Sequence, residues 1–108
     1  GAAAMAAGVA EELVHTMRAE HDLCSPLFTA CSGMNLLIMG NPSHAAKFKE
    51  LGALELAAQA AKQCETPIPD MLMFGHTFGE VHAAGPACAY SVRLLQLAER
   101  AAQARAER

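Results

Sequence analysis

Residues 41 to 61, NPSHAAKFKELGALELAAQAA, contain two short runs with helical periodicity that meet at a single glycine, Gly52. The first run opens on an Asn-Pro pair, and asparagine caps a helix while proline is preorganised for its first position. Glycine can adopt the left-handed conformation that ends a helix, because it has no Cβ to clash. We therefore expect a short helix over 42–51, a corner at Gly52, and a second helix over 53–64.

The rest of the chain also favours helix. Alanine is its commonest residue, and it has one tyrosine and no tryptophan, whereas β-branched and aromatic residues are the ones that favour strands. Apolar residues recur at helical spacing in 1–20, in 26–39 and in 87–108. The run 26–39 is apolar around most of its circumference, which predicts a helix between two layers. The segment 65–86 holds three prolines and three glycines, so we expect an ordered loop there.

Length and charge limit the classes of function. With 108 residues, 53% of them hydrophobic, the chain predicts one soluble globular domain over 1–108. A formal net charge of −3 with eight Lys and Arg argues against nucleic-acid binding. No apolar run approaches the ~18 residues of a membrane span, and the first residues lack the basic region of a signal peptide.

The cysteines favour an intracellular location. Cys24, Cys31, Cys64 and Cys88 lie far apart, without a CxxC pair, and six methionines accompany them. We interpret this pattern as free thiols in a reducing compartment, most simply the cytoplasm, rather than as a secreted disulfide framework. Cys31 and Cys88 are expected to behave as small buried apolar residues.

Two pairs of segments resemble each other within the chain. GAAAMAAGVA at 1–10 and GALELAAQAA at 52–61 share a glycine, an alanine and a later double alanine. ACSGMNLL at 30–37 and ACAYSVRLL at 87–95 share Ala-Cys and a later Leu-Leu. Internal similarity of this kind is typical of stacked helical repeats.

The stretch CSGMNLLIMGNPSHAAKFKELGALELAAQAA resembles the armadillo repeat, with its asparagine in a long third helix, its Asn-Pro start and its Gly-Ala corner. The resemblance implies an all-α fold: a short right-handed α-solenoid of about two incomplete repeats, with the loop before the last helix. In that frame 42–51, 53–64 and 87–108 are the three helices of one repeat. The helices 1–20 and 26–39 are the second and third helices of the preceding repeat, whose first helix is missing.

The resemblance also implies a non-enzymatic protein-protein interaction or scaffold module without a cofactor. Because roughly three repeats are needed to cover the stacking faces, we expect a protein partner, a larger complex or self-association. Such proteins also work in the nucleus and in cilia. The expected partner contacts are Asn35, Phe28 and Met39 near the third-helix surface, Met71, Met73, Phe74 and Phe78 in the loop, and Arg93, Arg100 and Arg105 on the last helix.

The alternative is a small helical-bundle subunit that binds a metal or other cofactor through histidine, methionine or cysteine. The nearest set of metal ligands is His76, Glu80 and His82, although Gly75 and Gly79 weaken the helix that would align them. Pairs such as CxxC, HxxxH and HExxH are absent, and so are nucleotide-binding and nucleophile motifs. The sequence therefore favours the interaction module over the cofactor-binding bundle and predicts no enzymatic activity.

Overall fold

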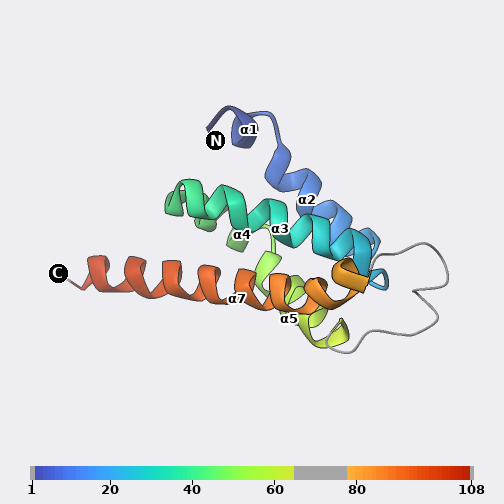
Figure 1. Cartoon of the computed structure of the whole chain (residues 1–108). Helices are drawn as coiled ribbons and strands as arrows, with labels where there is room; N and C mark the ends of the chain where they lie inside the picture. The colour runs from blue at the N-terminus through green and yellow to red at the C-terminus, as the bar shows by residue number, and fades with distance from the viewer. Residues whose placement is uncertain (1, 65–77, 108) are drawn as a thin grey trace.

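The computed structural model of the chain describes residues 2–64 and 78–107, with side chains for 2–64 and 84–107. The described residues form helices and contain no strand, which confirms the predicted all-α class (Figure 1). In chain order the elements are α1 (Ala2–Ala6), α2 (Val9–Ala19), α3 (Cys24–Gly40), the 3-10 helix η1 (Pro42–His44), α4 (Ala45–Glu50), α5 (Ala53–Gln63) and α7 (Phe78–Ala106).

The four longest helices form two layers. α3 and α7 lie side by side and run in the same direction, because Cys31 of α3 is bonded to Cys88 of α7 and Asn35 meets Ser91 one turn further along both helices. α2 packs on α3, α5 packs on α7, and α2 and α5 also contact each other. Both therefore cover the α3–α7 layer from the same side, and both run opposite to it (Figure 1).

The N-terminal segment is two helices, so the prediction of one helix over 1–20 is wrong. Gly8 adopts a left-handed conformation with φ 88°, the same value as Gly52. This conformation turns the chain between α1 and α2, as Gly52 turns it between α4 and α5. The similarity between 1–10 and 52–61 aligns Gly1 with Gly52. In the structure the counterpart of Gly52 is Gly8, so that alignment is wrong. The predicted corner at Gly52 is confirmed.

The helices that follow the two glycines also correspond. α2 and α5 each have 11 residues, and each buries three positions with the same spacing of four and then three. These positions are Ala10, Val14 and Met17 in α2, and Ala53, Ala57 and Ala60 in α5. A short helix, a left-handed glycine and an 11-residue amphipathic helix therefore occur twice within residues 2–63.

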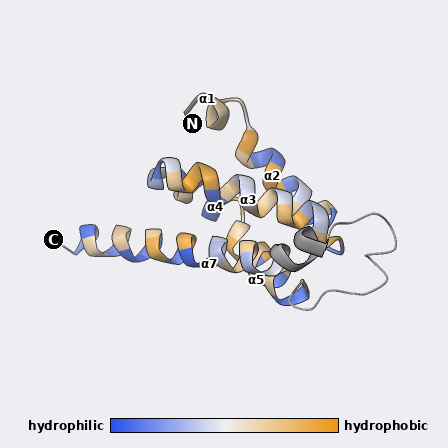
Figure 2. Cartoon of the chain, viewed as in Figure 1, coloured by the Kyte–Doolittle hydropathy of each residue, from blue (hydrophilic) through white to orange (hydrophobic). Residues whose placement is uncertain are grey.

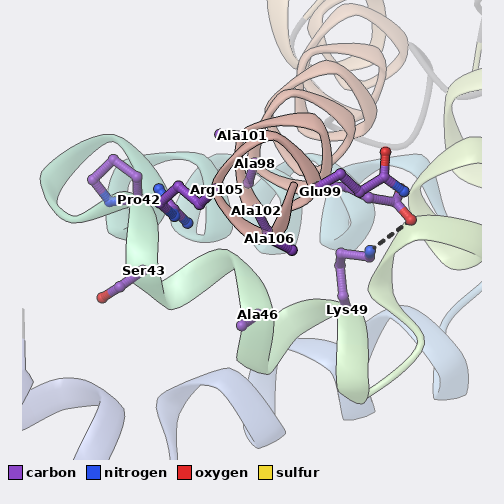
Figure 3. A pocket seen from close by; sticks show the side chains of 11 residues that line it. Pro42, Ser43, Ala46, Lys49, Ala98, Glu99, Ala101, Ala102, Arg105 and Ala106 are labelled. Atoms are coloured by element: carbon purple, nitrogen blue, oxygen red, sulfur yellow. Dashed lines mark ion pairs between the residues drawn. The ribbon is translucent and has the colours of Figure 1, made fainter. Parts of the chain in front are cut away.

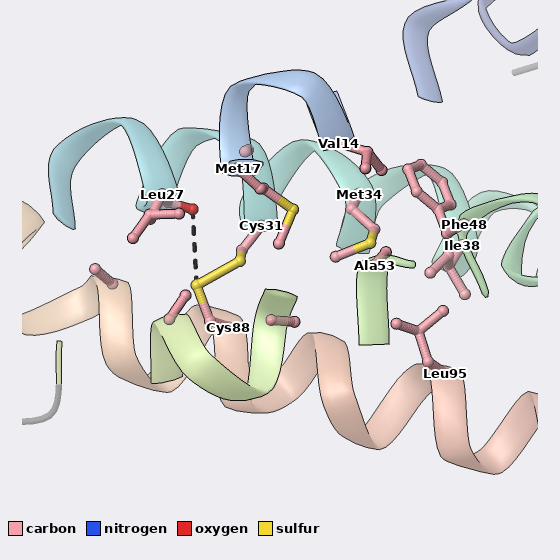
Figure 4. Close-up of a cluster of buried hydrophobic side chains, with 14 of the residues drawn as sticks. Val14, Met17, Leu27, Cys31, Met34, Ile38, Phe48, Ala53, Cys88 and Leu95 are labelled. Atoms are coloured by element: carbon pink, nitrogen blue, oxygen red, sulfur yellow. Dashed lines mark hydrogen bonds between the residues drawn. A yellow bond between two sulfur atoms is a disulfide. The ribbon is translucent and has the colours of Figure 1, made fainter. Parts of the chain in front are cut away.

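The core lies between the layers, and α3 supplies more of its large side chains than any other described helix. Leu27, Met34 and Ile38 of α3 are almost fully buried; Ile38 lies beside Phe48 of α4 and Leu95 of α7, and Leu27 lies near Cys88 (Figure 4). The apolar residues run along the inner sides of the helices, while the polar residues of α2, α5 and α7 lie outward (Figure 2). Helix α3 has α2 on one side and α7 on the other, and within the described residues its third side, with Leu36 and Met39, is exposed.

The predicted boundary between the loop over 65–86 and the last helix also changes. The loop expected over 65–86 is helical from Phe78 onward, with Pro86 inside the helix, and residues 65–77 lie outside the description. A proline removes one backbone hydrogen bond from a helix interior. Here Pro86 is exposed and its neighbours Ala84 and Cys88 are fully buried, so packing on both sides of the proline offsets that loss.

The prediction of free thiols is wrong, because the four cysteines form two disulfides. Cys24 is bonded to Cys64, and Cys31 is bonded to Cys88, with Cα atoms 5.8 and 5.2 Å apart. Cys24 and Cys31 are seven residues apart on α3, so they lie two turns apart on one face, where α5 ends and α7 passes. The intracellular location stays a prediction, and the cysteines no longer support it.

Candidate functional site

Large apolar side chains remain on the surface of the α3–α7 layer. Leu36 is 70% exposed and Met39 58% on α3, while Leu97 is 55% exposed on α7 and Tyr90 is also exposed. Leu23, directly before α3, is the one other large apolar side chain exposed to this degree within the described residues. The exposed apolar surface of the described chain is thus concentrated on the two long helices.

Helical spacing places these side chains on one face. Leu36 lies two residues from both Met34 and Ile38, which face the core, so it points away from the core on the opposite side of α3. On α7, Tyr90 and Leu97 are seven residues apart and therefore lie on one side of the helix. That side is turned away from α5. We call this surface the outer face; it consists of Phe28, Leu36, Met39, Tyr90, Leu94 and Leu97, of which Phe28 and Leu94 are half-buried.

The charge of the outer face is basic, although the chain as a whole is acidic. Helix α3 contains no charged residue, and the exposed Arg93 and Arg100 lie along one edge of α7, seven residues or about 10 Å apart. Glu99 lies on the other side of α7, where one of its carboxylate oxygens is 3.0 Å from Nζ of Lys49 on α4. Two guanidinium groups thus border the apolar surface.

Asn35 lies beneath the outer face, where it joins α3 to α7. Its side chain is 8% exposed; Nδ2 donates to the carbonyl of Ala87 at 3.0 Å, and Oδ1 accepts from Ser91 Oγ at 2.6 Å. Asn35 was expected among the contacts to a partner protein. In the structure it bonds to the backbone of the neighbouring long helix instead. Its role there is to fix the register of the two helices.

Two grooves flank the C-terminal helix. The larger, of about 760 Å³, lies between the last turns of α7 and the η1–α4 segment (Figure 3). Alanine is the commonest residue of its walls, with Pro42 and Arg105 at one end and the Lys49–Glu99 pair at the other. The smaller, of about 560 Å³, runs between α5 and α7. Neither groove brings together groups suited to acid-base or nucleophilic chemistry.

The structure brings some of the predicted contact residues together. Phe28 and Met39 lie on the outer face, Arg93 and Arg100 on its edge, and Arg105 beside the larger groove. The predicted residues Met71, Met73, Phe74 and His76 lie outside the described residues, and Phe78, Glu80 and His82 belong to the first turns of α7, whose side chains are not described.

Sequence reasoning missed Leu36, Tyr90 and Leu97. The available signal was that each is a large apolar residue off the inner stripe of its helix. For Leu36, the apolar residues on several sides of 26–39 led to the prediction of a helix buried between two layers. A helix that is apolar on all sides does not show which side lacks a neighbour.

Three further findings bear on function. Within the described ranges, no three His, Cys, Asp or Glu side chains gather as metal ligands would. None of the described helices has both the length and the apolar character needed to cross a bilayer. Comparison with protein-family models, with curated proteins and with solved structures finds no match to the chain.

Proposed function

We propose that the protein is a non-enzymatic interaction or scaffold module, and that its outer face is the surface that docks a partner protein. The observation that carries this proposal is the group of large apolar side chains exposed on two adjacent parallel helices. Contiguous apolar surface of this kind, with polar groups at its rim, is typical of protein interfaces. Tyrosine, methionine and arginine are also among the residues enriched at such interfaces.

We also propose that the module is an armadillo-like solenoid of two units. Its support is the repeated order of elements: a short helix, a left-handed glycine, an 11-residue helix and a long helix. In stacked repeats, equivalent helices of successive units run parallel, as α3 and α7 do. The outer face would then correspond to the concave surface that third helices line in such proteins.

The charges suggest the chemistry of the partner. Arg93 and Arg100 border the apolar residues of α7, and no carboxylate of α3 or α7 lies beside them in the described part of the outer face. A partner segment with apolar anchors and flanking Asp or Glu residues would complement this surface. Complementary charge mainly raises the association rate and the specificity of such an interface.

The test is quantitative capture of one partner by matched variants. The partner is first identified by cross-linking and affinity capture with the intact chain. Leu36→Glu/Leu97→Glu should then weaken its binding by a hundredfold or more, on the order of ~3 kcal/mol, because both side chains are central to the face. Ala58→Glu/Gln59→Glu, which adds two carboxylates to the exposed side of α5, is the control and should bind normally.

Circular dichroism must show equal helicity for both variants, since all four positions are exposed. Equal binding by the two variants would refute the proposed face. A further variant, Arg93→Ala/Arg100→Ala, should bind more weakly at low salt and approach the intact chain as salt screens the arginines.

A further inference from the structure

The outer face depends on how α7 is held against α3. The inner stripe of α7 runs through Ala84, Cys88, Ser91 and Leu95, all of which are fully buried. Only Leu95 among them is a large apolar residue. The buried stripe of α3 carries Leu27, Cys31, Met34 and Ile38, so α3 has three fully or almost fully buried large apolar residues where the described part of α7 has one.

Small side chains bury little apolar surface, and hydrophobic stabilisation is roughly proportional to the area buried. Besides Leu95 and the partly buried Val92 and Leu94, the described part of α7 is attached to α3 by two other means. One is the Cys31–Cys88 disulfide, and the other is the hydrogen bonding of Asn35 with Ser91 and Ala87. The disulfide lies one turn from this polar cluster, in the interior beneath the outer face.

We propose that the Cys31–Cys88 disulfide is a redox latch: the outer face is assembled in the oxidised chain and is lost when reduction lets α7 separate from α3. The latch itself is a property of the fold, and its biological consequence rests on the function proposed above for the outer face. The residues involved are those that join α3 to α7: Cys31 and Cys88, with the hydrogen bonds of Asn35 beside them.

The chemistry is ordinary thiol–disulfide exchange with a dithiol reductant. One thiolate of the reductant attacks a sulfur of the Cys31–Cys88 bond, which forms a mixed disulfide and releases the other cysteine. The second thiol of the reductant then displaces the remaining cysteine. Two electrons pass from the dithiol to the protein, which leaves two cysteine thiols and one oxidised reductant. Oxidation of the chain is the reverse exchange.

Exposure predicts the order in which the two disulfides react. Cys24 is 6% exposed, Cys64 1%, and Cys31 and Cys88 are fully buried. A reductant therefore meets Cys24–Cys64 first and reaches Cys31–Cys88 only during transient local openings of the α3–α7 contact, which persist once the bond is cut. Because Cys24–Cys64 connects the start of α3 to the end of α5 and does not involve α7, it provides a matched control for the latch.

The experiment is hydrogen exchange, read by mass spectrometry, on the intact chain and on two double variants without any partner present. In Cys31→Ala/Cys88→Ala the amides of α7 from about residue 86 to 97 should exchange at least about a hundredfold faster, while α2 and α3 keep most of their protection. In Cys24→Ala/Cys64→Ala the protection of α7 should stay within a fewfold of the intact chain.

A second pair, with Cys31→Val in place of Cys31→Ala, retains apolar volume in the core and separates the lost bond from a cavity. Treatment of the intact chain with dithiothreitol should give the same loss of α7 protection, at the stage when alkylation finds Cys31 and Cys88 as thiols. Retained protection of α7 without the bond would overturn the latch, and so would an equal loss of protection in all helices. Since no partner is used, failure here is distinct from failure of the capture experiment.

Discussion

The helices α1, α2 and α3 share a local order with the helices α4, α5 and α7, but the two sets differ in how tightly they are packed. α1, Gly8 and α2 correspond to α4, Gly52 and α5, with the same φ of 88° at both glycines. Yet α1 buries no residue, whereas α4 buries Ala45 and Phe48. At Gly8 nothing lies within 4 Å of where a Cβ would stand, and at Gly52 the side chain of Arg18 lies 3.3 Å from that point.

The long helices reverse this order. α3, the long helix of the first set, buries Leu27, Met34 and Ile38, whereas the described part of α7, the long helix of the second set, fully buries one large apolar residue, Leu95, and is bonded to α3 through Cys88. The first set thus has an open corner at Gly8 and a long helix with several large buried residues. The second set has a more closely packed corner at Gly52 and a long helix that a disulfide joins to α3. The same local signal, a left-handed glycine after a short helix, therefore gains its energetic weight from tertiary contacts.

The largest expected effect tests the difference between the short helices. Phe48 is fully buried and is the largest fully buried side chain described, so Phe48→Ala should destabilise the fold by about 3–5 kcal/mol. Met5 on α1 is only partly buried, and Met5→Ala should cost less than ~1 kcal/mol. Urea denaturation measures both, and equal costs would show that α1 is packed as firmly as α4.

A second comparison concerns the corners. A β-branched side chain at a left-handed position is strained by about 1–2 kcal/mol, and at Gly52 its Cβ would also press on Arg18. Gly52→Val should therefore destabilise by about 2–4 kcal/mol, and Gly8→Val by about 1–2 kcal/mol, in the same denaturation experiment. A Gly52→Val chain with normal helicity and melting temperature would show that the corner does not need its left-handed residue.

The polar contact between the long helices is expected to be smaller. Asn35→Ala removes the donor to the Ala87 carbonyl and the acceptor of the Ser91 hydroxyl, both near the buried interface. The Ser91 hydroxyl still donates to the Ala87 carbonyl at 3.1 Å, so the variant loses two hydrogen bonds without leaving these groups unpaired. We expect a loss of about 1–3 kcal/mol, concentrated in α7 in hydrogen exchange. Thr29→Ala is the control, because its hydroxyl bonds to the Ser25 carbonyl on an exposed part of α3. Uniform loss across all helices would contradict a role in joining α3 to α7.

The smallest expected effect concerns Arg18. Its Nη2 donates to the Leu51 carbonyl at 2.9 Å and so ties α2 to the end of α4, although the bond is exposed. Arg18→Ala should cost about 0.5–1 kcal/mol by thermal or urea denaturation. Combined with Gly52→Val, it should cost less than the sum of the two single changes, because the clash with Arg18 is then removed. Strict additivity would mean that the close approach at Gly52 carries no strain.

Much of the helical structure was predictable because its signals are local. The Asn-Pro start is confirmed, since Asn41 Oδ1 accepts hydrogen bonds from the backbone N–H and hydroxyl of Ser43. The helical spacing of apolar residues predicted α5 over 53–64, close to its observed bounds, and predicted α2 as part of one longer helix. The corner at Gly8 was not predicted, because a single glycine gives the same local signal whether the helix continues or turns. Pro86 was expected to lie in a loop, but it lies inside α7, where its neighbours Ala84 and Cys88 are buried.

Less of the candidate site was predictable. Phe28 and Met39 were expected at partner contacts, and Arg93 and Arg100 as charged contacts, but the outer face as a whole depends on which side of α3 has no neighbour. Asn35 was expected to face a partner, and its bonds to α7 follow only from the parallel placement of the two long helices. The segment 65–77 carried other expected contacts and lies outside the described residues.

The sequence by itself determined helices and corners, because periodicity, caps and left-handed glycines act over a few residues. Tertiary structure decided three matters that no local pattern carries. It paired four cysteines that lie 40 and 57 residues apart, since only the packing of α5 and α7 on α3 brings their sulfurs together. It turned Asn35 inward to α7. It also left one side of the α3–α7 layer open, because α2 and α5 both pack on the other side.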